Sequence, residues 1–324
     1  MKIAIVGAGI AGLTCADRLQ AQGHEVTLFD KARGPGGRMS TRRVATSAGE
    51  ASFDHGAPWF TVRDLRFRRA VLAWEDAGLV EQWPAVGEEA WVGVPAMNSV
   101  VKNMAGRHNV FFDCTVRGLA RRANGWCVLS DVTSMGPYDA AILAIPMEQA
   151  MAMVSLHDLA LARLGSRRKG LPCWTGLVAF GRRLSTNRDV IRDTGIFAQL
   201  VRNCAKPGRS GPESWVLQAS HAWSAANLER DKEAVMVDLL REFSAVIGEE
   251  FPEILTSQAH RWRYACYSGF SEEAFWNDDL KLGLCGDWLM GGNVEGGWIS
   301  GKSMADEVQI AAVQQNAFAS RSTG

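Results

Sequence analysis

The sequence predicts an α/β protein with two domains, one built on parallel strands and the other an α+β domain built on an antiparallel sheet. Three observations lead to this prediction. Residues 2–30 follow a strand–helix–strand pattern, residues 138–146 form another apolar run, and residues 151–275 hold tryptophan-rich, strand-like segments around an amphipathic helical stretch. With 324 residues, 47% of them hydrophobic, the chain can bury cores of this size.

The overall composition excludes several classes of function. The 35 lysines and arginines balance the 35 aspartates and glutamates, so no net field favours nucleic acid or an acidic membrane. Seven cysteines without a C-x-x-C pair argue against a disulfide framework and a zinc site, and they fit a reducing cytosol. The N-terminus lacks the apolar stretch of a signal peptide, and no run reaches the roughly 18 apolar residues of a membrane span. We therefore expect a cytoplasmic protein with no metal, membrane or nucleic-acid partner.

The first thirty residues carry a dinucleotide-binding pattern. An apolar strand leads into G-x-G-x-x-G, a helical pattern follows, and a second strand ends at Asp30. In such a Rossmann-like unit the glycines permit a tight turn, close approach of a pyrophosphate and close packing of helix on strand. The acid is placed to accept hydrogen bonds from ribose hydroxyls. The residues predicted to bind the cofactor here are Gly7, Gly9, Ile10, Ala11, Gly12 and Asp30.

A second glycine loop, DKARGPGGRMSTRR at 30–43, follows directly. Its backbone N–H groups can approach phosphate, and Arg38 can add charge. With the fingerprint, the acid and this G-G-R loop, the chain resembles the flavin-containing amine oxidoreductases, in which these parts form one FAD site. SFDHGAPWF at 52–60 also resembles that family's D-x-G-A segment, which lies along the flavin. The resemblance implies FAD contacts from Lys31, Gly37, Arg38, Asp54, His55, Gly56 and Ala57.

Near the other end of the chain, LGLCGDWLMGGNVEGGWISGKSMA at 282–305 predicts a strand, a loop and a helix over 298–305. The N-terminus of that helix, just after two glycines, would stabilise the negative charge that develops at one edge of the flavin ring on reduction. In the resembled family the acid after the strand meets the ribityl or pyrophosphate region, and the next segment caps the ring. The resemblance therefore implies that both chain ends build one site, with contacts from Asp287, Glu295, Gly296, Gly297, Trp298 and Ile299.

Two further segments complete the expected cofactor domain. Residues 109–131 alternate like strands joined at ANG, and the matching unit in the family supplies a backbone contact to adenine, here from Val116. Residues 92–105 resemble the G-x-P-x-M-N segment that reaches towards the flavin, which makes Met97 and Asn98 candidates, with core packing as the alternative for Met97. The expected domains are a discontinuous FAD-binding domain of 1–62, 93–150 and 276–324, and a substrate domain of 63–92 and 151–275.

The substrate pocket is expected to be aromatic, because a substrate that lies flat against a flavin is suited by aromatic walls. In HRWRY at 260–264, strand alternation puts His260, Trp262 and Tyr264 on one face and both arginines on the other. Those arginines are either solvated or, for a dinucleotide substrate, near its pyrophosphate. No Ser–His–Asp set and no metal spacing stands out. The predicted pocket residues are Asn98, His260, Trp262, Arg263, Tyr264 and Trp288.

Four segments, GPGGRMSTRR, DHGAPWFT, HRWRYA and CGDWLMGGNVEGGWISG, together resemble the renalases, especially the bacterial ones, over essentially the full length. The resemblance implies an amine oxidase or p-hydroxybenzoate hydroxylase-like architecture with non-covalent FAD. It implies an oxidase that takes a hydride from 2- or 6-dihydro isomers of NAD(P)H, giving NAD(P)+, and passes electrons to O2 to give H2O2. No catalytic side chain is then needed as acid or base, because the hydride leaves a ring that becomes aromatic.

Three alternatives to this function stay open. A flavin amine oxidase often carries an aromatic pair around the amine and a lysine near the flavin, which the few lysines of this chain do not obviously supply. A desaturase or isomerase of an apolar polyene would need a longer apolar tunnel or a membrane-binding segment. A flavin-binding protein without catalysis would stay yellow with every donor.

Overall fold

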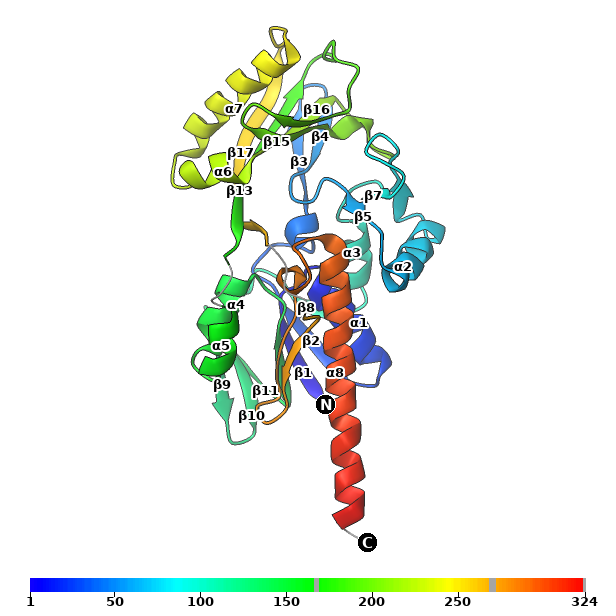
Figure 1. Cartoon of the computed structure of the whole chain (residues 1–324), viewed down its shortest axis with the longest axis vertical. Helices are drawn as coiled ribbons and strands as arrows, with labels where there is room; N and C mark the ends of the chain where they lie inside the picture. The colour runs from blue at the N-terminus through cyan, green and yellow to red at the C-terminus, as the bar shows by residue number, and fades with distance from the viewer. Residues whose placement is uncertain (166–168, 268–271, 323–324) are drawn as a thin grey trace. The chain divides into compact units, whose positions relative to one another are not determined.

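A computed structural model describes residues 1–165, 169–267 and 272–322 (Figure 1). The chain forms two compact units: unit 1 holds Met1–Gly37, Val101–Lys169 and Tyr267–Gly324, and unit 2 holds Arg38–Val100 and Gly170–Cys266. Residues 38–62 and 93–100 thus lie in unit 2, whereas the sequence placed them in the FAD-binding domain. The reason is local: the hairpin that begins at Thr41 packs on the large sheet of unit 2.

Unit 1 is built on a mostly parallel sheet. Its strand order is β18-β19-β12-β1-β2-β8, and only β18 runs antiparallel to its neighbour among these described strands. The central strands are apolar and buried on both faces, as parallel strands are. The strands are β1 (Lys2–Val6), β2 (Glu25–Phe29), β8 (Asn109–Phe111), β12 (Ala140–Leu143), β18 (Phe275–Asn277) and β19 (Leu282–Leu284).

Two helices from opposite ends of the chain lie side by side in unit 1, α1 (Ile10–Ala21) and α8 (Val294–Ser322) (Figure 1). Gly301 allows the close approach, because a Cβ there would collide with the carbonyl oxygen of Ala11. The expected meeting of the two chain ends is therefore present in the fold. The expected start of the second helix at 298 is wrong, because the helix begins four residues earlier.

The rest of unit 1 is a small antiparallel sheet and short helices. The predicted hairpin turn at ANG joins β9 (Val116–Arg122) to β10 (Gly125–Ser130), and β11 (Ser134–Tyr138) completes the sheet. The first three residues of the 109–131 segment instead form β8, which joins the parallel sheet. The helices are α3 (Ser99–Ala105), which begins at the edge of unit 2, α4 (Met147–Val154), α5 (Leu159–Gly165) and the 3-10 turn η3 (Asp287–Leu289).

Unit 2 is the predicted antiparallel α+β part. Its main sheet has the order β14-β15-β16-β13-β17, and every described pairing in it is antiparallel. The helices α6 (His221–Ala226) and α7 (Lys232–Ile247) contact this sheet, and Asp231 caps α7 by accepting from the backbone N–H groups of Glu233 and Ala234. The strands are β13 (Leu171–Phe180), β14 (Val190–Thr194), β15 (Phe197–Arg202), β16 (Glu213–Ala219) and β17 (Ile254–Cys266).

A second apolar cluster in unit 2 joins the main sheet to the hairpin of β3 (Thr41–Thr46) and β4 (Gly49–Asp54). The hairpin ends at Asp54, so the fold sets the D-H-G-A segment directly against the sheet. The remaining elements are the 3-10 turns η1 (Gly37–Met39) and η2 (Asn203–Ala205), the helix α2 (Leu65–Asp76), and the strands β5 (Phe60–Thr61), β6 (Val80–Gln82) and β7 (Ala90–Gly93).

Candidate functional site

The three glycines of the G-x-G-x-x-G motif in unit 1 have different structural roles. Gly7 has a φ of 108°, and a Cβ there would lie 2.9 Å from the carbonyl carbon of Ala144. A Cβ at Gly12 would collide with the carbonyl oxygen of Gly7, so this glycine sets how closely α1 meets the strand. Gly9 differs, because a Cβ there would meet nothing within 4 Å. It is the N-cap of α1, and no side chain caps the helix. The open space at Gly9, next to the helix N-terminus, leaves room for an anion that the first N–H groups of α1 could bind.

The Asp30 carboxylate accepts hydrogen bonds from backbone N–H groups of the two neighbouring turns. One carboxylate oxygen accepts from the N–H of Ala8 at 2.7 Å, and the other accepts from the N–H of Ala32 at 2.8 Å. Each oxygen keeps a further lone pair, so ribose hydroxyls remain possible donors. Residues after β8 lie next to Asp30 again, where the Cys114 N–H donates to the Asp30 carbonyl at 3.0 Å. That return places Val116, buried at the start of β9, two residues beyond the turn.

The second glycine loop lies against the first. Gly37 has a φ of 52°, and a Cβ there would come within 3.5 Å of the Gly9 Cα. Lys31 is exposed, and Arg38 is half-buried at the first residue of unit 2. The two loops that the sequence assigned to one phosphate site are therefore adjacent at their glycines.

The start of α8 differs from the prediction in a way that changes the role of one glycine. The side chain of Asn293 accepts from the N–H of Gly296 at 2.7 Å, and its carbonyl accepts from the N–H of Gly297 at 3.0 Å. Asn293 is thus the cap, and the N–H of Gly297 is used inside the helix. A Cβ at Gly297 would lie 2.9 Å from Ile10 Cγ2, which makes this residue a packing glycine between α8 and α1. The signal that could have found the cap is the asparagine itself.

The other predicted residues of the C-terminal segment surround that helix start. Asp287 is buried, and its carbonyl accepts from the N–H groups of Met290 and Gly292. Its Cβ is 3.6 Å from where a Gly297 Cβ would be. Trp288 is buried at 1% exposure, which favours a core role. Glu295 and Trp298 are half-buried, and Ile299 is buried.

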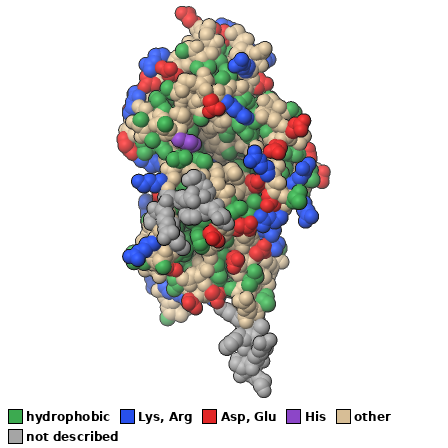
Figure 2. Space-filling view, in the orientation of Figure 1, with side chains coloured by type: hydrophobic (Ala, Val, Ile, Leu, Met, Phe, Trp, Pro, Cys, Tyr) green, Lys and Arg blue, Asp and Glu red, His purple; other side chains and the backbone are tan. Residues whose placement is uncertain are grey.

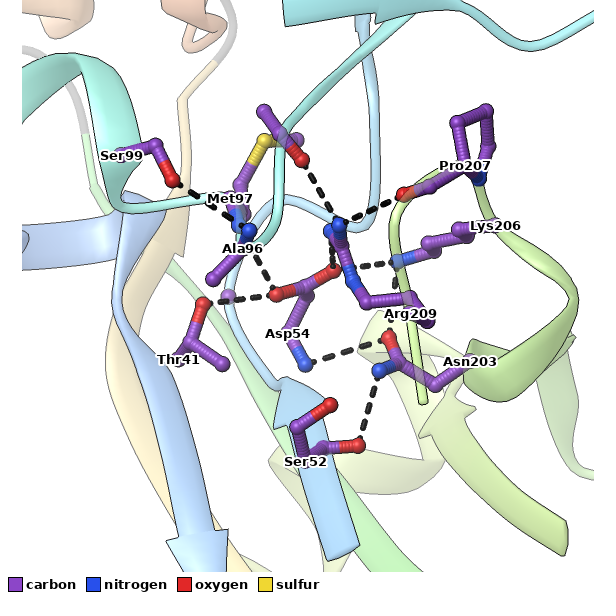
Figure 3. A network of polar contacts seen from close by, with 12 residues as sticks. Thr41, Ser52, Asp54, Ala96, Met97, Ser99, Asn203, Lys206, Pro207 and Arg209 are labelled. Atoms are coloured by element: carbon purple, nitrogen blue, oxygen red, sulfur yellow. Dashed lines mark hydrogen bonds and ion pairs between the residues drawn. The ribbon is translucent and has the colours of Figure 1, made fainter. Parts of the chain in front are cut away.

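In unit 2, Asp54 is the centre of a buried polar network (Figure 3). Its carboxylate accepts from Thr41 Oγ1 at 2.7 Å and from the Met97 N–H at 3.1 Å. It also accepts from Lys206 Nζ at 2.9 Å and from Arg209 Nη2 at 2.6 Å. With four donors on its two oxygens, the Asp54 carboxylate links several segments of unit 2 and so stabilises the fold. Met97 is likewise fully buried, with its N–H spent on Asp54, while Asn98 is half-buried.

Two cations face this one carboxylate, and sequence analysis missed both. Burial alone would raise the pKa of Asp54, but the charges of Lys206 and Arg209 hold it well below its ordinary value. Burial lowers the pKa of Lys206 to about 8, and the attraction of Asp54 opposes that shift. The amide of Asn203 accepts from Lys206 and donates to the carbonyl of Ser52 at 2.8 Å. Both cations come from the segment KPGRSGPES at 206–214, whose composition is that of a loop. Nothing in that composition indicates a buried lysine.

His55, His260 and Trp262 form a cluster of rings in unit 2. The His55 ring centroid lies 4.9 Å from that of His260 and 5.3 Å from that of Trp262, and Trp262 Nε1 donates to the His55 carbonyl at 2.8 Å. Burial, with the charge of Arg42, lowers the pKa of His55 to about 4, and burial lowers that of His260 to about 3. Both imidazoles are therefore neutral at pH 7. His55 Nδ1 is buried and has no hydrogen-bond partner in the described part of the chain.

The arginines of HRWRY lie on the opposite face, as alternation predicted. Arg263 bonds Glu229 at 2.6 and 2.8 Å, and Arg261 bonds the same carboxylate at 3.1 Å. Arg263 was proposed for the substrate pocket, but it does not join the ring cluster. Tyr264 is half-buried, and the ladder shifts register between Trp262 and Cys266, so simple alternation does not place its ring.

A cavity of about 490 Å³ opens elsewhere in unit 2. Its walls include Trp59, Arg192 and Gln199, and it contains none of the predicted pocket residues. Gln199 Nε2 donates to Gln218 Oε1, and Gln218 Nε2 donates to the carbonyl of Gly56 at 2.6 Å. Two uncharged amides thus link this cavity to the D-H-G-A segment, and no sequence motif indicated either of them.

On the face drawn in Figure 2, acidic and basic side chains are intermingled. Among the residues that the structure describes, no group of three or more His, Cys, Asp or Glu side chains could hold a metal ion. Over the same residues, no helix combines the length and the apolar character needed to cross a membrane.

Comparison with known proteins agrees with this geometry. Residues 84–309 match the family model of flavin-containing amine oxidoreductases, and residues 5–71 match that of NAD(P)-binding Rossmann-like domains. Because the first match spans more than half of the chain, the chain belongs to the flavin-containing amine oxidoreductases. The membership implies a flavin cofactor and an oxidoreductase activity.

Solved structures and curated proteins add narrower likenesses. A putrescine oxidase double mutant is 12% identical, with a TM-score of 0.72 over 95% of this chain and 99% of its own. The cyclohexylamine oxidase of Brevibacterium oxydans is 12% identical, with a TM-score of 0.68 over 97% of this chain and 99% of its own. These show the fold. The 4,4'-diapophytoene desaturase of Staphylococcus aureus is 58% identical over 40 residues, which are 12% of this chain and 8% of the desaturase.

The residues present fit a flavin dinucleotide. The open space at Gly9, ahead of an uncapped helix N-terminus, suits a pyrophosphate, and Asp30 keeps lone pairs for a ribose.

Proposed function

We propose that this chain is an FAD-dependent oxidase of the 2- and 6-dihydro isomers of NAD(P)H, as the resemblance to renalases implies. The observation that carries the proposal is the neutral His55–His260–Trp262 cluster beside the D-H-G-A segment. When bound, FAD would supply the hydride acceptor, with O2 as the final electron acceptor and H2O2 as its product. Oxidation of a dihydronicotinamide needs no proton transfer by a side chain. The uncharged rings of His55, His260 and Trp262 therefore suit such a substrate.

The chain's own residues then bind and position. The first N–H groups of α1 hold the pyrophosphate, and Asp30 orients the ribose while fixing the fingerprint loop. Within unit 2, Trp262 Nε1 donates to the His55 carbonyl and so holds the D-H-G-A segment in place. FAD is bound without a covalent link in this proposal, and O2 and the dihydro isomer are the other reactants.

The carboxylate next to the cluster argues against an amine substrate. An amine is mostly an ammonium ion at pH 7, so an amine site gains from a nearby carboxylate or base. Asp54 directly precedes His55, but its two oxygens already accept from four donors. Neither histidine is charged or paired with a carboxylate in the described structure. A neutral, flat donor therefore fits this cluster better.

Amine oxidation remains the second candidate, because both structural neighbours named above are amine oxidases by name. Polyene desaturation is supported only by the 40-residue likeness. A flavin-binding protein without catalysis is the third alternative.

The test is anaerobic mixing of the FAD-loaded protein with each dihydro-NAD isomer while the flavin absorbance is followed. We expect rapid bleaching by one or both isomers, NAD+ as product, and H2O2 when air is admitted. Bleaching by putrescine or cyclohexylamine alone would make the protein an amine oxidase, and bleaching by no donor would favour the non-catalytic alternative. Release of the yellow colour into the supernatant after denaturation would support non-covalent binding.

A matched pair of variants connects this test to the ring cluster. His260→Asn should slow bleaching by the dihydro isomer, because it removes one wall of the cluster. His157→Asn changes a histidine of unit 1 whose Nε2 bonds the Leu119 carbonyl, and it should leave the rate unchanged. Equal rates for both variants would remove the cluster from the site.

A further inference from the structure

A row of polar side chains crosses four neighbouring strands of the main sheet in unit 2. Gln199 of β15 is directly opposite Gln218 of β16. Thr175 of β13 lies opposite Gln218 on one side and opposite His260 of β17 on the other. Residues directly opposite each other share one face of a sheet. Neighbouring strands lie about 4.8 Å apart, so three spacings put Gln199 roughly 14 Å from His260. The row therefore connects the ring cluster to the wall of the cavity of about 490 Å³, which includes Gln199.

The segment 55–59 follows the same course above this row. The His55 ring belongs to the ring cluster, where its centroid lies 4.9 Å from that of His260. The next carbonyl, that of Gly56, accepts from Gln218 Nε2 at 2.6 Å. Trp59, three residues further on, is part of the cavity wall. The ring cluster and the cavity are thus joined by one short segment and by one row of side chains, all within unit 2.

The carbonyl of Gly56 also fixes how two amide side chains are oriented. A carbonyl oxygen can only accept, so the NH2 group of Gln218 must face Gly56. Gln218 Oε1 is then the atom that accepts from Gln199 Nε2. This leaves Gln199 Oε1 as the acceptor that the second amide can present to a ligand in the cavity.

One wall of the cavity is an aromatic ring that its neighbours hold in place. Trp59 is half-buried, and its ring meets that of Trp83 edge-on with 6.1 Å between centroids. The guanidinium carbon of Arg192 lies 5.0 Å from the Trp59 ring centroid. A ring that is already held loses little further freedom when a flat ligand packs against it. A nucleic base is a ligand of this kind, because every base has a π-face that can stack.

The charged groups of the cavity wall favour hydroxyl and amino donors over a phosphate. Arg63 pairs with Glu89 at 3.2 Å, so these two charges largely cancel. Glu88 and Asp193 add two carboxylates to the wall, and an acid of this kind accepts from the ribose hydroxyls in dinucleotide sites. Together with Gln199 Oε1 they make the cavity rich in acceptors. Adenosine fits such a cavity, because it is neutral and flat and carries an amino group and ribose hydroxyls.

We propose that this cavity is the subsite for the adenosine half of the dinucleotide donor, whose nicotinamide half lies at the ring cluster. Trp59 and Gln199 are then specificity-determining residues that contact only the non-reacting half of the substrate. The pyrophosphate bridges the roughly 14 Å between the two places, a distance set by three strand spacings. The proposal rests on the oxidase function proposed above and adds to it the place where the remote half binds. Binding energy from that half lowers KM without entering the hydride transfer itself.

The first test compares two donors that share the reacting ring. One is a dihydro isomer of NAD, and the other is the same isomer of nicotinamide mononucleotide, which lacks the adenosine half. Oxygen consumption by the FAD-loaded, full-length protein gives kcat and KM for each. We expect a similar kcat and a KM about tenfold lower for the dinucleotide, the order of effect of one base–aromatic stack. Oxidation of both donors with equal KM would overturn the subsite alone, whereas oxidation of neither would overturn the oxidase function and the subsite with it.

The second test removes the aromatic wall. Trp59→Leu should raise the KM for the dinucleotide about tenfold, and it should leave kcat and the KM for the mononucleotide unchanged. Trp276→Leu is the matched control, because Trp276 is also a half-buried tryptophan but belongs to unit 1, and it should alter neither KM. A dinucleotide KM that Trp59→Leu does not move would overturn the subsite.

The third test uses a variant with a gentler change, Gln199→Met, which removes the amide acceptor and keeps an unbranched side chain. It should raise the dinucleotide KM about fivefold, the order of effect of one neutral hydrogen bond. Because Gln199 also bonds Gln218, a purely structural role would disturb Gly56 and the ring cluster, and both donors would then react more poorly. A defect confined to the dinucleotide would support the subsite. An equal defect for both donors, or no defect, would contradict it.

Discussion

Asp30 of unit 1 and Asp54 of unit 2 are both acids that the sequence assigned to the cofactor, and they differ in what their oxygens already bind. Asp30 is half-buried and accepts one backbone N–H on each oxygen. Asp54 is fully buried and accepts from two cations, a hydroxyl and a backbone N–H. An acid that ends a strand can thus serve a ligand or serve the fold. The difference lies in the partners that distant segments bring, and these cannot be seen from the motif.

Among the substitutions that test this comparison, Asp54→Asn should have the largest effect on stability. It leaves Lys206 and Arg209 as buried cations without a carboxylate, and such losses cost about 3–5 kcal/mol of the free energy of unfolding. Urea unfolding would measure the loss. Asp131→Asn is the control, because Asp131 is partly exposed and lies 3.9 Å from Arg117, and it should stay within about 0.5 kcal/mol of the native protein. A loss below about 1 kcal/mol for Asp54→Asn would mean that Lys206, with its lowered pKa, simply gives up its proton.

The next effect concerns the packing glycine of unit 1. Gly297→Val places a branched side chain against Ile10 Cγ2, and overpacking of this kind costs about 1–3 kcal/mol. Thermal or urea unfolding would report it. Gly118→Val is the control, because a Cβ at Gly118 meets nothing within 4 Å. If Ile10 is the obstacle, Ile10→Ala should recover part of the Gly297→Val loss in a double-mutant cycle, and strict additivity would refute the contact.

A pH series tests whether the ring cluster of unit 2 is neutral. The folded-state pKa values of His55 and His260, about 4 and about 3, lie below the ordinary 6.5. As the pH falls below 6.5 the unfolded chain takes up these protons first, so stability is lost from pH 6.5 down to about 4 for His55 and about 3 for His260. Each imidazole contributes a slope of about 1.4 kcal/mol per pH unit at most. His260→Asn should therefore flatten the profile measured from pH 4.5 to 7, and an unaltered slope would mean that His260 titrates normally.

The smallest expected effect is that of Arg263→Gln. Arg263 lies on the exposed face of β17, away from the ring cluster, and its guanidinium pairs with Glu229 from the segment between α6 and α7. We expect no measurable shift of the unfolding midpoint and no change in the KM for a dihydro isomer. A large rise in KM would restore Arg263 to the substrate site that the sequence predicted for it.

Sequence reasoning succeeded where a local pattern has one physical solution. The G-x-G-x-x-G turn, the strand ending before Asp30 and the hairpin at ANG each follow from nearby residues. It also predicted that His260 and Trp262 share a face, because alternation is a property of the strand itself. It failed at Lys206, Arg209 and Gln218, since each acquires its role from a partner more than a hundred residues away. The start of α8 was misplaced because two glycines looked like a loop, whereas the Asn293 cap allowed the helix to include them.

The Asp54 network also sets how slowly one backbone amide exchanges its hydrogen with solvent. The Met97 N–H is fully buried and its acceptor is a carboxylate locked by two cations. The Met97 N–H can exchange with deuterium only when Thr41, Met97 and residues 203–209 all move away from Asp54. Such an opening is close to global unfolding of unit 2. The N–H of Ala96, one residue earlier, donates to the Ser99 hydroxyl at 3.3 Å and needs only a local opening. The boundary between fast and slow exchange should therefore fall between these two adjacent amides.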